Sequence, residues 1–229
     1  MNKESNLYTI IYAAITVVVA SIMLAYTSET LYPLQAKNVA IDKIRHILSS
    51  INIISKHSTA EQLFNEYIVD SYLVDSKGEK VPGDPLKTEL AEELRKPVAE
   101  RKYPVFEASI GGKKKYILSM HGTGLWGPIW GFISLDDDKN TVYGASFDHE
   151  GETPGLGAEI GLPQFGNEFH GKKFFNTEKK FTSIAVVKPG HPAHGQDYVD
   201  GISGGTITSR GVNDMLKSSI GAYEMFLRK

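Results

Sequence analysis

The chain has 229 residues, carries a net charge of −2 and contains no cysteine. This length suits one domain, or one domain with an appendage, and the absence of a basic excess argues against nucleic acid as a partner. Without cysteine there can be no disulfide, iron–sulfur site, zinc–thiolate site or thiol nucleophile. Redox chemistry would therefore need an organic cofactor, or a metal held by His and carboxylate side chains.

An uncharged apolar segment occupies residues 7–26. As a helix it would span about 30 Å, the thickness of one hydrocarbon core. Tyrosines near its two ends suit the membrane interface. A cleaved signal peptide is the alternative, but its apolar region is usually shorter, and no small-x-small cleavage site follows Ala25. We therefore predict a retained transmembrane anchor.

The charges around this segment predict its orientation. The nearest basic residues are Lys3 before it and Lys37 after it, so the positive-inside rule places the N-terminus in the cytoplasm. This predicts residues 1–6 as a cytoplasmic N-terminus, 7–26 as an anchor in the cytoplasmic (inner) membrane, and 27–229 as an extracytoplasmic, periplasmic domain.

Several segments after the anchor have helical patterns. Residues 58–67 predict a short helix capped by Ser58 or Thr59, and residues 86–96 predict a charged helix ended by Pro97. An amphipathic helix is predicted from apolar residues at helical spacing, which are Ile41, Ile44, Leu48 and Ile51.

The middle of the chain is rich in strand patterns. Gly111 and Gly112 separate two strand-like segments, and the polar residues 136–140 separate two more, so two hairpins are predicted. Residues 67–81 indicate a strand and a turn. Residues 181–190 indicate a further strand ended by Pro-Gly.

A last helix is predicted near the C-terminus, with Thr208 or Ser209 placed to cap it. Its apolar residues keep helical spacing: Val212, Met215, Leu216, Ile220 and Tyr223. The order of these elements predicts an α+β protein. It would consist of one N-terminal transmembrane helix followed by a single mixed α/β domain with antiparallel hairpins.

Two glycine-rich stretches could approach a ligand closely. Residues 122–131 contain Trp126 and Trp130, which either form a flat apolar wall for a planar ligand or pack over the end of a hairpin. Residues 148–160 contain carboxylates and a hydroxyl among glycines, but lack the helical spacing of a His-Glu-x-x-His metal site. Neither this stretch nor the histidines at 191 and 194 predicts a metal site.

A third stretch, "DGISGGTITSRG", runs from Asp200 to Gly211. The first turn of a helix offers unpaired N–H groups and a partial positive charge, which suit a phosphate. A hydroxyl there could be esterified to that phosphate or could simply cap the helix. The residues alone do not choose among Thr206, Thr208 and Ser209.

The segment "DGISGGT" resembles the flavinylation motif D-x-x-[ST]-G-A-T, in which the last threonine is joined to FMN through a phosphoester bond. It occurs together with "PLQAKNVAIDKIRHIL", "GLWGPIWG" and "FDHEGETPGLGAEI". In this order the set resembles the NqrC family, a subunit family of the sodium-translocating NADH:quinone oxidoreductase, over nearly the whole chain. One departure is Gly205, where the motif usually has alanine, and the extra ordering entropy of glycine would slow modification.

The resemblance implies a covalent FMN on Thr206, and an electron-carrying subunit of a complex that oxidises NADH, reduces quinone and exports sodium ions. The other subunits, the membrane and a magnesium-dependent flavin transferase would be its partners. The transferase would recognise Asp200, Ser203, Gly204 and Gly205. The flavin ring would be lined by Glu152, Thr153, Leu156 and Gly157, with Leu125, Trp126 and the further candidate Trp130 nearby.

The resemblance further implies that Thr208 contacts the phosphate while capping the helix. No residue would act as an acid, base or nucleophile, and no metal would be bound. Two alternatives stay open: the flavinylated subunit of the related complex that couples ferredoxin and NAD, and a membrane-anchored binding module without redox chemistry.

Overall fold

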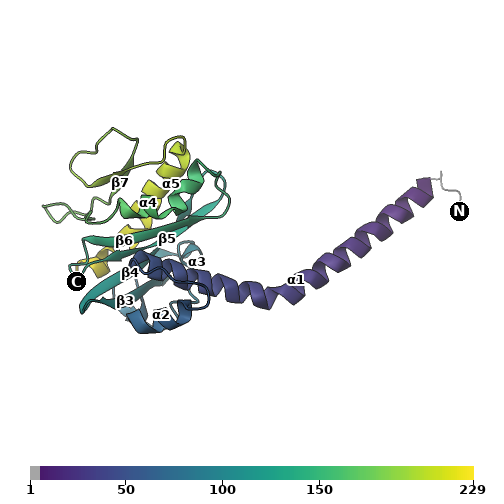
Figure 1. Cartoon of the computed structure of the whole chain (residues 1–229), viewed down its shortest axis with the longest axis horizontal. Helices are drawn as coiled ribbons and strands as arrows, with labels where there is room; N and C mark the ends of the chain where they lie inside the picture. The colour runs from purple at the N-terminus through teal and green to yellow at the C-terminus, as the bar shows by residue number, and fades with distance from the viewer. Residues whose placement is uncertain (1–5) are drawn as a thin grey trace. The chain divides into compact units, whose positions relative to one another are not determined.

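The computed structural model describes residues 6–229, and the chain divides into two units, Met1–Asp42 and Lys43–Lys229 (Figure 1). The predicted cytoplasmic N-terminus, including Lys3, lies almost wholly outside the described residues. Each unit is considered by itself below.

The first unit belongs to helix α1, Asn6–Ser50, which continues without a break through Pro33. The predicted anchor and the predicted amphipathic helix after it are thus parts of one helix. Among the described residues, α1 alone is long and apolar enough to cross a membrane, and no part of its most apolar stretch is buried. The N-terminal helix is therefore suited to membrane anchoring.

The second unit is built on a six-stranded antiparallel sheet in the order β2-β1-β3-β4-β5-β6. Both predicted hairpins are confirmed, and Gly111 and Gly112 take the positive φ values that a tight two-residue turn requires. Residues 124–127 form a third hairpin turn, between β4 and β5. The strands are β1 Ile68–Val74, β2 Lys80–Val81, β3 Tyr103–Ile110, β4 Lys113–Thr123, β5 Pro128–Leu135 and β6 Val142–His149.

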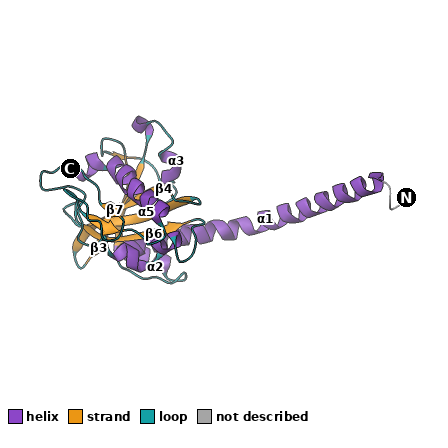
Figure 2. Ribbon diagram, turned by 90° about the horizontal axis from the view of Figure 1, so that it is seen from above, coloured by secondary structure: helices purple, strands orange, loops and turns teal. Residues whose placement is uncertain are grey.

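Helices cover both faces of this sheet (Figures 1 and 2). The last turns of α1 and helix α2 (Ala60–Tyr67) lie on one face, where Phe64 meets Phe106 edge to face and Ser134 donates a hydrogen bond to the carbonyl of Ser50. Helix α5 lies on the other face, over the larger core. The other helical segments are α3 Leu90–Glu93, a 3-10 turn Val98–Glu100, a 3-10 turn Gly157–Gly161, α4 Pro163–Asn167, α5 Thr206–Met215, a π-helical turn Leu216–Ile220 and α6 Glu224–Leu227.

Two predicted elements are shorter than the sequence suggested. The charged helix expected over residues 86–96 is only α3, because Asp84 accepts hydrogen bonds from the N–H groups of Leu86 and Lys87 and holds that segment in a turn. The strand expected over 181–190 is only β7 (Ala185–Val187). Ser183, with a φ of 64°, interrupts the extended backbone before it.

A second, parallel sheet was not predicted at all. Strand β7 pairs with β8, Tyr198–Asp200, and residues 188–197 form the connection between them. The pair lies beside α5 (Figure 1), and Asn213 on that helix accepts a hydrogen bond from the N–H of Val186 at 3.2 Å. This arrangement brings β8 directly before the start of α5.

The C-terminal helix is anchored to the sheet by Tyr223, which is buried. Its hydroxyl donates to the carbonyl of Pro104 at 2.9 Å and lies 3.0 Å from the Ser119 hydroxyl. We expect Tyr223→Phe to lower the free energy of unfolding by about 1–2 kcal/mol, because a buried carbonyl loses its donor. Denaturant titration of the full chain in detergent measures this. Tyr143→Phe is the matched control, and equal losses in both variants would contradict the assignment.

Candidate functional site

The first residue of α5 is Thr206, and its side chain is exposed. The chain reaches it through a tight turn in which Gly205 N–H donates to the carbonyl of Ile202. Gly204 has a φ of 77°, and a Cβ there would lie 2.6 Å from Leu156. Only glycine combines this backbone conformation with this close approach. The turn therefore presents the Thr206 hydroxyl at the N-terminal end of the helix, where backbone N–H groups lack helical partners.

The prediction that Thr208 or Ser209 caps this helix is wrong. Gly205 occupies the cap position, and both hydroxyl side chains are buried within the first turns. Thr208 donates to a carboxylate oxygen of Glu152 at 2.6 Å, and Ser209 accepts from the N–H of Ile202 at 2.9 Å. Each hydroxyl thus connects the helix to a neighbouring loop instead of capping its N-terminus.

The carboxylate of Glu152 is buried and has both oxygens hydrogen-bonded. One accepts from Thr208 and the other from the backbone N–H of Trp126 at 2.9 Å. Burial by itself raises the pKa of Glu152, but these hydrogen bonds outweigh it, so the pKa lies below its ordinary value. The space around the carboxylate is full, since a Cβ at Gly157 or Gly124 would overlap it.

These contacts join three segments that are distant in sequence: the 124–127 turn, the loop at residues 150–157 and the first turn of α5. Four large apolar side chains are left exposed on them, with exposed fractions of 48% for Leu125, 68% for Trp126, 42% for Leu156 and 55% for Ile207. Exposed apolar groups gathered on well-held loops are typical of a ligand or partner surface. An apolar surface thus adjoins the start of α5.

The remaining predicted residues have different surroundings. Thr153 is exposed, and its carbonyl accepts from the N–H groups of Leu156 and Ala158, which shapes the loop. Asp200 ends β8, and its N–H donates to Glu168. Trp130 pairs with Asp148, which contacts His46 of α1, so strand alternation places its side chain on the α1 face of the sheet. The Trp130 side chain thus lies on the face of the sheet opposite to α5.

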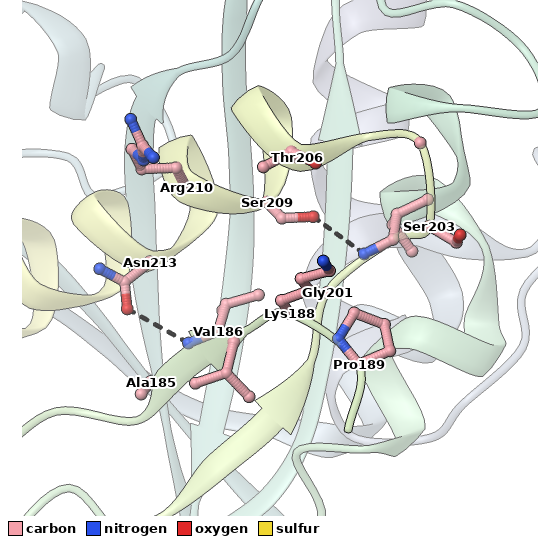
Figure 3. A pocket seen from close by; sticks show the side chains of 13 residues that line it. Ala185, Val186, Lys188, Pro189, Gly201, Ser203, Thr206, Ser209, Arg210 and Asn213 are labelled. Atoms are coloured by element: carbon pink, nitrogen blue, oxygen red, sulfur yellow. Dashed lines mark hydrogen bonds between the residues drawn. The ribbon is translucent and has the colours of Figure 1, made fainter. Parts of the chain in front are cut away.

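A pocket of about 570 Å³ adjoins Thr206 (Figure 3). Its walls are residues 185–189, 201–204 and one face of α5, and its lining includes Ser203, Gly204 and Thr206. Lys188, Arg210 and Asn213 also line it and were missed from the sequence. Arg210 could have been noticed, because it follows Thr206 by four residues on one helix face. Lys188 reaches the pocket only through the pairing of β7 with β8.

Two histidines of the stretches that were considered for a metal, His149 and His191, have other contacts. His149 accepts a hydrogen bond from the N–H of Glu152, and His191 lies against the carbonyl of Pro189. Within residues 6–229, no three His, Asp or Glu side chains gather as metal ligands would.

The fold and this site define a flavin-binding protein class: residues 124–221 match the family model of the FMN-binding domain, a span that contains the three joined segments and α5. More particularly, the chain belongs to the family of NqrC, the C-lettered subunit of the Na(+)-translocating NADH-quinone reductase. It is 32% identical to that subunit of Vibrio vulnificus (strain YJ016), over 85% of this chain and 82% of the relative. It is 30% identical to that of Yersinia pestis, over 100% and 94%.

Comparison with solved structures supports this assignment. The crystal structure of the same reductase subunit from Parabacteroides distasonis is 53% identical, with a TM-score of 0.83 over 87% of this chain and 98% of that chain. That of Shewanella oneidensis NqrC, at 23% identity, shares the fold, with a TM-score of 0.70 over 84% and 97%. The family resemblance and the α+β fold class predicted from the sequence are thereby confirmed.

The hydrogen bonds to Glu152 predict a pH dependence of stability. Because folding lowers its pKa below 4.5, the ionised carboxylate stabilises the fold fully above that pH, and the contribution is lost as pH falls through the folded value. The free energy of unfolding lost in Glu152→Gln should therefore shrink between about pH 6 and about pH 3. Denaturant titrations across this range test it, with the exposed Glu150→Gln as control. A pH-independent difference would contradict it.

Close packing around Glu152 predicts a second effect. A Cβ at Gly157 would overlap both Glu152 and the Thr208 hydroxyl, so Gly157→Ala should cost about 1–3 kcal/mol of unfolding free energy. Gly151 lies in the same loop, and a Cβ there would meet nothing within 4 Å. Gly151→Ala should change stability by less than about 0.5 kcal/mol. Equal values for the two variants, measured by denaturant titration, would refute this packing.

Proposed function

We propose that this chain carries FMN within a membrane complex that oxidises NADH, reduces quinone and exports sodium ions. Support comes from its relatives, named as the NqrC subunit of the Na(+)-translocating NADH-quinone reductase, and from the FMN-binding domain match. The observation that carries the proposal is Thr206: an exposed hydroxyl on the first residue of α5, inside the matched region. The other subunits of that complex would be its partners, and the chain would have no complete activity alone.

The residues around Thr206 fit FMN. The glycine turn leaves the hydroxyl accessible, the helix start favours a phosphate, and the exposed side chains of Leu125, Trp126 and Leu156 offer an apolar surface to a flavin ring. When bound, FMN supplies reversible electron transfer. The chain itself would hold and orient it, shield it from water and keep it near its redox partners.

The proposed link is a phosphoester between FMN and Thr206. In the attachment step the Thr206 oxygen would form a bond to the flavin-side phosphorus of a flavin dinucleotide, and the P–O–P bond would break. A nucleoside monophosphate would be the leaving group, and the hydroxyl proton would be released. A magnesium-dependent flavin transferase would catalyse it and would recognise the loop that contains Asp200, Ser203, Gly204 and Gly205.

Close packing explains why position 205 is glycine in this chain and not the usual alanine. A Cβ there would lie 3.1 Å from the Ile202 Cβ and 3.3 Å from the backbone nitrogen of Gly157. The alanine usual in the motif would therefore need its neighbours to move by a few tenths of an ångström. Glycine at this position suits the bulk of Ile202 in the same turn.

We propose different roles for the residues that were expected to line the flavin ring. Leu125, Trp126, Thr153 and Leu156 have exposed side chains and can contact the ring. Glu152 is buried and has both oxygens engaged, so it would act by holding the surrounding segments, and Gly157 and Thr208 would act with it.

The membrane arrangement is part of the proposal. Residues 7–26 would form the transmembrane part of α1, residues 1–6 would lie in the cytoplasm, and residues 27–229 would form the periplasmic FMN-binding domain. The exposed apolar helix supports the anchor, and the positions of Lys3 and Lys37 support the orientation.

Replacement of Thr206 tests the attachment. Co-expressed with a flavin transferase, the full chain should stay fluorescent in a denaturing gel and gain the mass of one FMN phosphoester. Thr206→Val should abolish both signals, because no hydroxyl remains to form the ester. Thr123→Val, which removes another exposed threonine, should keep them. An adduct that persists in Thr206→Val would sink the assignment, and peptide mass spectrometry would show whether Thr208 or Ser209 carries it.

A further inference from the structure

The pocket beside Thr206 is positively charged, although the whole chain has a net charge of −2. Lys188 and Arg210 are among the 13 residues that line it, and none of the 13 is Asp or Glu (Figure 3). Both cations are exposed. Across residues 6–229, neither ammonium nor guanidinium has an ion-pair or hydrogen-bond partner. Two unpaired cations on one concave surface favour an anionic ligand.

The walls of this pocket are held in place by the chain itself. Ser209 accepts a hydrogen bond from the N–H of Ile202, and Asn213 accepts one from the N–H of Val186 (dashed lines in Figure 3). The wall segments 185–189 and 201–204 are therefore both held to α5. Gly201 packs closely between the first of these segments and α5. Its N–H donates to the carbonyl of Val187 at 2.7 Å, and a Cβ on Gly201 would lie 2.9 Å from the Ser209 side chain. A pocket fixed in this way loses little conformational entropy when a ligand binds.

The position of Thr206 relates this pocket to the flavin. Thr206 lines it, and Arg210 lies one helical turn further along α5, where side chains at i and i+4 are neighbours. Lys188, the residue directly after β7, also lines the pocket. A phosphate next to the Thr206 hydroxyl would thus have a cation on each of two separate elements.

We propose that Lys188 and Arg210 form the phosphate-binding part of the flavin site and bind the terminal phosphate of FMN independently of the covalent bond. The inference rests on the proposed function, in that FMN is taken as the ligand. The two side chains are positioning residues, because they would place the phosphorus near Thr206 without entering the ester. Charge-assisted hydrogen bonds to phosphate give such a site a preference for FMN over riboflavin, which has the same ring without the phosphate.

The test separates phosphate binding from covalent attachment. The full chain in detergent, as Thr206→Val and expressed without transferase, is titrated with FMN and with riboflavin while flavin fluorescence is followed. We expect FMN to bind at least about tenfold more tightly, because hydrogen bonds between a cationic side chain and a phosphate are stronger than those between neutral groups. Inorganic phosphate should compete with FMN and leave riboflavin binding unchanged.

Variants of Lys188 and Arg210 test whether these two residues cause the preference for FMN over riboflavin. Lys188→Gln and Arg210→Gln should each reduce the preference for FMN several-fold, and the double variant should abolish it. Arg210→Lys, which keeps the charge, should retain most of it. Lys217→Gln is the matched control, because Lys217 is exposed on the same helical segment but lies outside the pocket. Thermal unfolding of each variant shows that the fold is kept.

The possible outcomes decide between the two proposals. Equal affinities for FMN and riboflavin, no measurable binding of either flavin, or an equal loss in Lys217→Gln would overturn the phosphate site. A preference for FMN that depends on Lys188 and Arg210 supports it, even if Thr206 is never modified in the chain that retains it. In that case only the covalent attachment would fail.

Discussion

The close approach of helix α5 to the end of strand β4 is the constraint on which the site depends. Glycine permits it on both elements: a Cβ at Gly122 would lie 2.7 Å from the Cβ of Met215, and one at Gly211 would overlap the carbonyl oxygen of Thr123. A glycine inside a helix costs about 1 kcal/mol relative to alanine, and this contact offsets that cost. A larger residue at either position would push α5 away from the strand and separate Thr206 from the turn after β4.

The hydrogen bonds of Glu152 depend on this close approach of α5 to β4. A buried carboxylate is costly unless its oxygens are hydrogen-bonded, and its two donors, Thr208 and the N–H of Trp126, come from elements that meet only when α5 lies on β4. The carboxylate therefore links the position of the helix to that of the loop and the turn. The surroundings of Thr206 are thus arranged before any ligand binds, which reduces the ordering cost of binding.

The parts of this structure that could be predicted from the sequence depend on neighbours in the chain. The hairpin at Gly111 and the apolar spacing of the last helix are local patterns, and both are confirmed. The cap could not be predicted, because several hydroxyls in a row can cap a helix and the turn that ends at Gly205 decides where α5 begins. Lys188 could not be predicted either, because a parallel pair such as β7 and β8 has no local signature.

The same geometry bears on a question that composition left open, which is how a transferase would distinguish three hydroxyls within four residues. Thr208 has an exposed fraction of 1% and Ser209 of 7%, and both side chains already have hydrogen-bond partners inside the fold. Thr206 is exposed and lines the cationic pocket. Serine and threonine hydroxyls differ little in intrinsic reactivity, so selection of Thr206 would follow from access. Because burial of Thr208 satisfies Glu152, the contact that builds the site would also protect the competing hydroxyl.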